Sequence, residues 1–306
     1  MHNNIPVVQE EEAQLRLLRA RTQTYDDATK LLLVQLGVTV AIPVVGSIAT
    51  LFQPDLRVYF AALALVVLLL DPLWIDRWYK RLLKRAAKIA ERFDTTVLEL
   101  PWNQFVVGDE VETEDVHQAA KRYCGRHDDS QLVGWYPRDA GEAPLHLGRL
   151  ICQRTNLRYD SQLRRNYSTA LIAGVAVIAV LVFGVSLARN DSLAQWVLTL
   201  TPMAPLLGWS VREYFRQRDT ADQLEDLMKA ARKLWQDSLT GTVGAAESGT
   251  KAREFQDAIF ARRVSSALIV PLVYKLSRPR LEDEMNEAAS DFLKRYREHS
   301  GSRDAS

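Results

Sequence analysis

Residues 31–52, LLLVQLGVTVAIPVVGSIATLF, contain no charged side chain over 22 positions. Residues 168–188 and 192–211 are also uncharged, and residues 58–75 contain a single carboxylate, that of Asp71. A helix needs about 20 mostly apolar residues to cross the ~30 Å hydrocarbon core of a lipid bilayer. The sequence therefore predicts four transmembrane helices.

Only short links separate the members of each pair, at residues 53–57 and 189–191. Links of this length join antiparallel neighbours, so each pair forms a transmembrane hairpin, residues 31–75 and 168–211. All long segments then lie on one side of the membrane. They are predicted to be an N-terminal cytosolic helix, a cytosolic stalk and sensor segment, and a C-terminal cytosolic helical segment, at residues 1–30, 76–167 and 212–306.

The distribution of basic side chains predicts the orientation. Within 15 residues of the predicted spans, 17 Lys and Arg side chains flank the hairpins, whereas the links contain Arg57 and Arg189. Cytoplasmic segments beside membrane spans carry the excess of Lys and Arg. We therefore expect both termini and both large soluble segments in the cytoplasm. The whole chain has a net charge of only +1, so no general attraction to DNA is predicted.

The apolar pattern of the soluble segments predicts mostly helices. A helix over residues 7–30 runs into the first span, and a helical stalk follows the second, with Asp71 and Pro72 as its expected N-cap and first-turn proline. A short strand and turn are expected over residues 95–107, where apolar and polar side chains alternate. The predicted fold class is mainly α: a polytopic membrane protein with four transmembrane helices in two hairpins and a mostly helical cytosolic domain containing a few short strands.

The sequence contains no catalytic signature: it has no nucleophile elbow, Walker motif, dinucleotide-binding glycine loop or HExxH. No motif therefore points to catalysis, and we predict no cofactor. Cys124, His127, His146 and Cys152 together have the ligand types of a zinc site, but their spacing matches no common zinc-finger pattern. We predict no metal site.

Aromatic side chains occur beside basic and amide side chains in the soluble segments. An arginine or lysine binds phosphate while an aromatic ring stacks on a base, so this combination suits an anionic nucleotide. The alternative is that the tryptophans anchor the core and the arginines face water or lipid. The candidate ligand-binding residues are Trp102, Asn103, Trp135, Tyr136, Arg154, Asn156, Arg158, Tyr159, Arg263, Tyr274 and Lys275.

The predicted fourth span is the most polar of the four. Its amide and hydroxyl side chains and its prolines suit either the lining of a pore or the packing and kinks of an ordinary membrane helix. The candidate pore-lining residues are Gln195, Thr199, Thr201, Pro202 and Pro205.

Short motifs follow one another along nearly the whole chain. They are Asn3-Asn4-Ile5-Pro6, Gln14-Leu15, Ala20-Arg21, Tyr25-x-x-Ala28-x-Lys30, Phe93-Asp94, Leu100-x-Trp102-Asn103, Trp135-Tyr136, Cys152-Gln153-Arg154-x-Asn156, Phe255-Gln256-Asp257-x-Ile259-Phe260-x-x-Arg263, Pro271-x-x-Tyr274-Lys275, Arg280 and Glu284-Met285. With the four predicted spans, their order resembles the SMODS-associating 4TM effectors, which are encoded beside cyclic-oligonucleotide synthases in bacterial antiphage (CBASS) systems. One departure is the apolar segment 267–273, which is more polar in the family.

The resemblance implies a non-enzymatic effector of the bacterial inner membrane, multi-pass with both termini cytoplasmic. A functionally linked nucleotidyltransferase would make a cyclic di- or oligonucleotide after phage infection. Its binding to the cytosolic part would rearrange the spans and disrupt the lipid bilayer, which amounts to abortive infection. Because four helices alone enclose too little space for a sizeable pore, we also predict a homo-oligomer.

Two other functions stay open on the sequence alone. An ion channel or small-solute transporter would have charged residues deep in its spans, whereas Asp71 lies near the cytosolic end of its span. A membrane-anchored scaffold for a protein partner would use the long amphipathic helices equally well.

Overall fold

The computed structural model describes residues 3–42, 44–46, 49, 53–188, 192, 204–266, 268–269 and 271–304. All regular structure in these ranges is helical, so the mainly-α prediction is confirmed for them. In chain order the elements are α1 (Ile5–Val8), α2 (Glu12–Leu36), η1 (Gly37–Ala41), η2 (Pro54–Leu56), α4 (Arg57–Leu70), η3 (Asp71–Ile75), α5 (Asp76–Val97), α6 (Gln104–Val107), α7 (Thr113–Cys124), η4 (Arg138–Glu142), α8 (Leu145–Ala188), α10 (Ala204–Leu239), α11 (Ala245–Ser265) and α12 (Pro271–Asp304).

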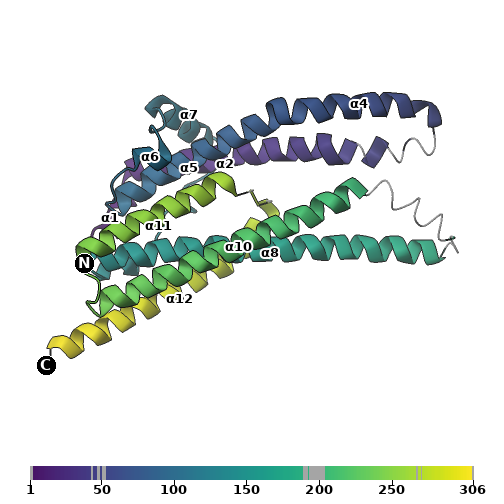
Figure 1. Ribbon diagram of the computed structural model, residues 1–306. Helices are drawn as coiled ribbons and strands as arrows, with labels where there is room; N and C mark the ends of the chain where they lie inside the picture. Colours follow the sequence, from purple (N-terminus) through teal and green to yellow (C-terminus); the bar gives the residue numbers. More distant parts are fainter. Residues whose placement is uncertain are drawn as a thin grey trace.

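Figure 1 shows two long helical arms that leave a common bundle in the same direction. The upper arm consists of the end of α2 with η1 and α4, and the lower arm consists of the second half of α8. The α4 helix continues through the π-helical segment η3 into α5, which returns to the bundle beside α2. In the bundle, α2 packs against α5 and α7, and α8 packs against α10, α11 and α12.

Three helices run without a break across the predicted boundaries between soluble and membrane segments. These helices are α2, α8 and α10, which cross the boundaries at residues 30/31, 167/168 and 211/212. Because an α-helix is hydrogen-bonded along its whole length, it is stiff over such distances. The three helices therefore connect the bundle to the apolar segments without a hinge in the helical backbone.

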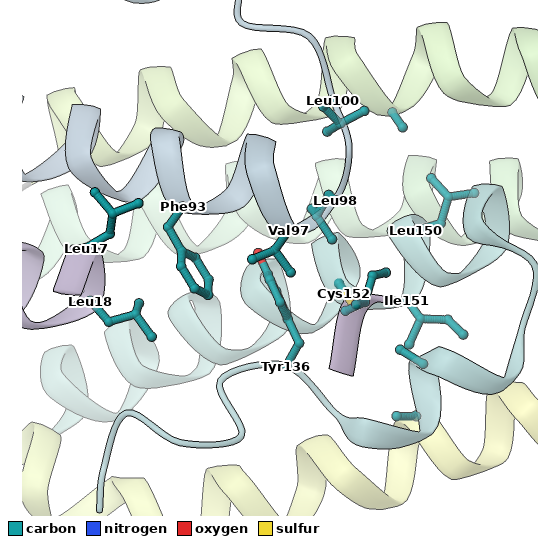
Figure 2. Packing of buried hydrophobic residues seen from close by; sticks show 14 of the residues in the cluster. Leu17, Leu18, Phe93, Val97, Leu98, Leu100, Tyr136, Leu150, Ile151 and Cys152 are labelled. Atoms are coloured by element: carbon teal, nitrogen blue, oxygen red, sulfur yellow. The ribbon is translucent and has the colours of Figure 1, made fainter. Parts of the chain in front are cut away.

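The main core lies where α2, α5 and the start of α8 meet (Figure 2). Each helix contributes fully buried apolar side chains, such as Leu18, Phe93 and Ile151. Tyr136, from the loop before α8, stacks on Phe93 with the ring centroids 6.0 Å apart and the ring planes at 22°. Burial of each such side chain stabilises the fold by about 1.5–3 kcal/mol, which fixes these elements against one another.

The N-terminal segment is held against η4 and the residue that follows it. Asn3 Nδ2 donates to the carbonyl oxygens of Ala140 and Ala143 at 2.7 and 2.8 Å. Its Oδ1 accepts from the Ile5 backbone N–H at 3.0 Å. A Cβ atom at Gly148 would lie 2.7 Å from Asn3 Nδ2, so this close approach requires glycine. The motif around Asn3 therefore has a structural explanation.

The strand predicted over residues 95–107 is wrong. The α5 helix extends into this range, and the short α6 lies inside it. Thr95 Oγ1 donates to the Glu91 carbonyl oxygen at 2.8 Å, so this β-branched residue fits the last turn of α5. The apolar alternation arises because Leu98 and Leu100 are buried from a loop. No strand occurs elsewhere in the described ranges, so the few short strands predicted for the cytosolic domain are not found in them.

Asp71 and Pro72 do not start a new helix, so this prediction is also wrong. They belong to η3, which joins α4 to α5 without a break. A proline lacks the backbone N–H and its ring clashes with the preceding turn of an α-helix. A π-helical turn is wider than an α-helical one, so a proline can stand within a helix that continues on both sides.

The arms carry the apolar surface of the molecule. Within the described ranges, one helix, Glu12–Gly46, is long and apolar enough to cross a membrane, and Val58–Val67 is a shorter apolar helix. Large apolar side chains are exposed along both arms, including Val58 and Val180, which are 75% and 69% exposed. Such contiguous apolar surface suits contact with lipid or with a partner. The predicted fourth span falls mainly outside the described ranges, and the four-span topology stays a prediction.

Candidate ligand-binding site

A cavity of about 540 Å³ opens between α2, the loop before η4, α8, α11 and α12. Its volume lies in the range of roughly 300–1,000 Å³ that is usual for small-molecule sites. Its charged and aromatic lining residues are five arginines (Arg21, Arg164, Arg262, Arg263 and Arg278), three carboxylates (Asp26, Asp160 and Glu282) and four aromatics (Tyr25, Tyr123, Trp135 and Tyr159). The excess of cations makes the cavity attractive to an anion.

Arg21 lies on α2 with its guanidinium over two aromatic rings. The guanidinium carbon is 4.5 Å from the ring centroid of Trp135 and 5.1 Å from that of Tyr25. Tyr25 follows one helical turn after Arg21, so both side chains share a face of α2. In the described part of the chain, no carboxylate lies within ion-pair distance of Arg21. A cation–π contact orients this guanidinium without neutralising its charge.

Two further cavity arginines are held by polar partners on their own helix or on α10. Arg164 Nε lies 3.1 Å from a carboxylate oxygen of Asp160, and its NH1 donates to Gln217 Oε1 at 2.7 Å. Arg262 donates to the side-chain oxygen of Gln223 on α10. These contacts fix the two guanidinium groups in the cavity wall.

Arg263 connects the cavity to a buried polar network centred on Asp94. Its NH1 donates to Asp94 Oδ2 at 2.5 Å, and the same oxygen accepts from Gln256 Nε2 at 2.9 Å. The other carboxylate oxygen, Oδ1, accepts from Tyr136 Oη at 2.7 Å. Because Asp94 is only 1% exposed, these three donors replace the hydration that its carboxylate loses on burial.

A second carboxylate, that of Glu91, is completely buried one helical turn before Asp94. It accepts from Arg253 NH2 at 2.6 Å and from Gln256 Nε2 at 2.9 Å. Burial and the charge of Asp94 raise the pKa of Glu91. Burial also raises the pKa of Tyr136 well above its ordinary value, so the tyrosine hydroxyl stays protonated and donates to Asp94. The network thereby fixes α11 against α5.

Four of the predicted ligand-binding residues line the cavity: Trp135, Asn156, Tyr159 and Arg263. They come from the loop before η4, from α8 and from α11, which are far apart in the sequence. Asn156 Nδ2 also donates to Tyr136 Oη at 3.1 Å, so the cavity wall and the polar network are in direct contact.

Three other predicted ligand-binding residues do not line the cavity. The Trp102 indole N–H donates to the Gly108 carbonyl oxygen at 2.9 Å, and its ring packs on an apolar cluster. Asn103 Nδ2 donates to Asp257 Oδ2 at 2.8 Å. Tyr136 is fully buried in the polar network. Their contacts join elements of the bundle.

Of the four remaining predicted ligand-binding residues, two lie outside the cavity and two have side chains that the structure does not describe. The Arg154 guanidinium carbon is 4.6 Å from the ring centroid of Phe292, on the side of α8 that faces α12. Arg158 is exposed, and neither arginine lines the cavity. Tyr274 and Lys275 belong to α12, but their side chains lie outside the described part of the structure.

The predicted pore-lining residues lie at or beyond the edge of the described ranges. Pro205 is described only as backbone of α10, and the others, Gln195, Thr199, Thr201 and Pro202, are not described. Among described residues, no group of three or more His, Cys, Asp or Glu side chains is placed to hold a metal ion.

The sequence reasoning missed Arg21 and Tyr25 as cavity residues. Both belong to the N-terminal motifs, on the helix that leads into the first predicted span. A basic and an aromatic side chain four residues apart on one helix face were the available signal. Arg262 was missed beside Arg263, although both lie in the same cation-rich wall.

Fold and cavity together define a class of protein. It is a helical bundle with a cation-rich cavity, joined by continuous helices to arms with an apolar surface. The chain belongs to the SMODS-associating 4TM effector domain family, which it matches over residues 3–292. It is 24% identical over 285 residues to a probable CBASS effector molecule from Bacillus cereus (strain VD146), covering 90% of this chain and 94% of that protein. No solved structure matches the chain.

The resemblance noted in the sequence is thereby confirmed. The family is one of CBASS effectors with a membrane-associated 4TM domain, which assigns the chain to antiviral defence. It is not a family with a known catalytic fold.

Proposed function

We propose that this protein binds a cyclic di- or oligonucleotide on its cytosolic side and responds by disrupting the inner membrane, so that an infected cell dies before the phage matures. The observation that carries the proposal is the cavity, in which arginines and aromatic rings face one space. A functionally linked nucleotidyltransferase would supply the messenger, in keeping with the family to which the chain belongs.

Arg21 and Trp135 form the centre of the proposed ligand seat. Stacking of a base on an aromatic ring is worth about 1–3 kcal/mol, and it tolerates any base. Arg21 offers N–H donors to a phosphate while its plane stays over the rings. Arg262 and Asn156 add donors from two other walls of the cavity. A cyclic dinucleotide, with two bases and two phosphates, would use both kinds of group at once.

A path from the cavity toward the membrane arms runs through the segment after α11. Leu268 and Ile269 line the cavity, and the Leu268 backbone N–H donates to Tyr79 Oη at 3.1 Å. Tyr79 lies on α5 close to η3 and packs in an apolar cluster with Ala28 of α2. A ligand that repositions this segment would therefore act on α2 and α5, the helices that lead to the upper arm.

The required free energy is within reach of such a site. Shifting an equilibrium from about 1:99 to about 99:1 needs about 5.5 kcal/mol of differential affinity between the two arrangements. Hydrogen bonds to charged groups contribute about 1.5–3 kcal/mol each. Two or three such bonds, made only in the open arrangement, would therefore be sufficient.

The proposal includes a homo-oligomer in the bilayer, because the helices of one chain enclose little space. Chemical cross-linking of membrane extracts, with and without a cyclic nucleotide, tests this part. Cross-linked multimers are expected at least in the presence of the ligand. A strict monomer under both conditions would contradict it.

Ligand binding by the full-length protein in detergent tests the proposal. A panel of cyclic di- and trinucleotides is titrated by calorimetry, and at least one is expected to bind. Arg21→Gln and Trp135→Ala should each weaken that binding about tenfold or more, because each removes a contact of about 1.5 kcal/mol or more. Arg16→Gln is the matched control, since Arg16 is an exposed arginine on the same helix that does not line this cavity.

Two results would contradict the proposed ligand site. The first is that no member of the panel binds to protein that is folded by circular dichroism. The second is that both cavity variants bind the ligand as tightly as the wild type does, which would place the ligand elsewhere.

A further inference from the structure

Four arginines gather at a junction of three helices, away from the cavity. Arg154 and Arg158 come from the first part of α8, Arg232 from the end of α10, and Arg295 from the second half of α12. The α8 helix packs against both α10 and α12. The other three arginines are the charged groups that act most strongly on Arg154.

Arg154 is the most enclosed member of this arginine cluster. Its guanidinium carbon lies 4.6 Å from the ring centroid of Phe292, so the plane of the group is backed by an aromatic ring. Its Nε atom is buried and has no hydrogen-bond partner among the described residues. Arg158, Arg232 and Arg295 are exposed around it. One face of the cluster is therefore closed by protein and the other is open to solvent.

The arginine cluster differs from other basic positions of the same helices because it has no acidic partner. In the described part of the chain, none of its four guanidinium groups forms an ion pair with a carboxylate. By contrast, Arg165 on α8 is paired with Asp222 and Glu225 at 2.7 and 2.5 Å. On α12, Arg297 is paired with Glu142.

Charge repulsion within the arginine cluster is unfavourable for the folded protein. Burial and the three neighbouring arginines lower the pKa of Arg154 to about 10. Like charges at close range repel, and the repulsion is removed most effectively by a bound anion. Guanidinium groups present planar forks of N–H donors that match phosphate oxygens.

We propose that the cluster of Arg154, Arg158, Arg232 and Arg295 is a second binding site, for a soluble phosphate-bearing anion. None of the four lines the cavity, so the two sites are separate. The start of α8 and the ends of α10 and α12 lie at the end of the bundle away from the arms (Figure 1). Arg154 precedes the predicted span at residue 168 by 14 residues, which is about 20 Å along a helix. A site at this distance from the predicted membrane surface suits a soluble anion better than a lipid headgroup.

The test uses the full-length protein in lipid-free detergent at low, constant ionic strength, with inorganic triphosphate as the probe. Thermal unfolding and calorimetric titration are measured for the wild type and for Arg154→Gln, Arg295→Gln, Arg297→Gln and Arg21→Gln. Triphosphate should bind the wild type and raise its unfolding temperature. Arg154→Gln should weaken binding about tenfold, and the exposed Arg295→Gln roughly two- to fivefold.

The two remaining variants are the controls. Arg297→Gln removes the same charge from α12 at a paired position and should leave triphosphate binding unchanged. Arg21→Gln removes a cavity arginine and should leave the Arg154-dependent binding of triphosphate unchanged, which separates this site from the proposed cyclic-nucleotide site. Without triphosphate, Arg154→Gln should unfold at the wild-type temperature or above it, because a repulsion is relieved.

Several results would overturn the inference. One is that triphosphate does not bind the wild type, and another is that it binds Arg154→Gln as tightly. A loss of binding in Arg21→Gln with retention in Arg154→Gln would place the anion in the cavity instead. If Arg154→Gln does not fold, Arg295→Gln decides the matter, since its side chain is exposed. A parallel sedimentation assay with phosphatidylglycerol vesicles distinguishes a lipid source, which would be indicated if Arg154→Gln lost only vesicle binding.

Discussion

Arg263 and Arg154 both lie at helix contacts in the bundle, but their electrostatic surroundings are opposite. Arg263 donates to the buried carboxylate of Asp94 at 2.5 Å, whereas the main charged neighbours of Arg154 are three other arginines. Arg21, in the cavity, has two aromatic rings for neighbours. The comparison separates an arginine whose charge is paired within the fold from two arginines that have no carboxylate partner among the described residues and that we propose bind anions.

The largest expected effect comes from breaking the ion pair between Arg263 and Asp94. Asp94→Asn leaves the largely buried Arg263 guanidinium without a counter-charge. Removing one partner of a buried ion pair lowers the free energy of unfolding by about 3–5 kcal/mol. Denaturant unfolding of the full-length protein in detergent measures this change.

A matched control for Asp94→Asn is Asp226→Asn. The Asp226 side chain is 76% exposed and pairs with Lys229 on the surface of α10. Its removal should change the free energy of unfolding by no more than about 0.5 kcal/mol. If both variants lose the same small amount, the Asp94 network does not hold α11 against α5.

Arg21→Gln should show the reverse pattern, a large effect on binding and a small effect on stability. Cyclic-nucleotide affinity should fall about tenfold or more, because a charge-assisted contact to phosphate is lost. The free energy of unfolding should change by less than about 1 kcal/mol, the size of a partly exposed cation–π contact. Calorimetric titration and denaturant unfolding on the same sample give both values. Equal losses of stability in Arg21→Gln and Asp94→Asn would remove the distinction between the two kinds of arginine.

Tyr136→Phe tests whether the Tyr136 hydroxyl serves the polar network or the ligand-binding cavity. The change removes the hydroxyl that donates to Asp94 at 2.7 Å and accepts from Asn156 at 3.1 Å. We expect the free energy of unfolding to fall by about 1–2 kcal/mol, the cost of one or two lost buried hydrogen bonds. Cyclic-nucleotide affinity should change less than threefold. A larger loss of affinity than of stability would instead mean that Tyr136 contacts the ligand.

The smallest expected effect concerns His146, a titratable cation at the start of α8. Burial and the nearby Arg149 lower the pKa of His146 below its ordinary value. As the pH falls, the unfolded chain therefore protonates His146 first, so stability is present above about pH 6.5 and is lost as the pH falls toward the lowered pKa. The half-buried ring is screened by solvent, so the loss is less than about 1 kcal/mol. Unfolding of the wild type and of His146→Gln between about pH 7 and about pH 5 should show a smaller loss in the variant. Identical pH profiles would refute this assignment.

The helices were predictable from sequence because their apolar residues recur at helical spacing. The helix predicted over residues 7–30 is present as α2, although it begins at Glu12 after the separate short α1, and the long helix after the predicted fourth span is the main part of α10. The strand over residues 95–107 could not be excluded in advance, because Leu98 and Leu100 alternate as they would in a sheet although each is buried from a loop. Local alternation does not reveal which distant element covers a side chain.

The sequence predicted the kinds of side chain that line the cavity, but not which individual residues line it. The sequence indicates arginine, amide and aromatic side chains for an anionic ligand, and Trp135, Asn156, Tyr159 and Arg263 do meet there. Whether a given arginine faces a carboxylate, a ring or another arginine depends on contacts between helices that are far apart in the chain. The sequence therefore could not show that Arg263 pairs with a carboxylate whereas Arg154 lies beside other arginines.

Dye release from proteoliposomes tests the central claim most directly. The full-length protein is reconstituted with an encapsulated fluorophore, and a cyclic nucleotide that binds the protein in detergent is added on both sides of the membrane. We predict release only when that nucleotide is present, no release with Arg21→Gln, and wild-type release with Arg16→Gln. Release that is equal with and without the nucleotide, or no release with a nucleotide that binds, would contradict the proposed coupling between the cavity and the membrane.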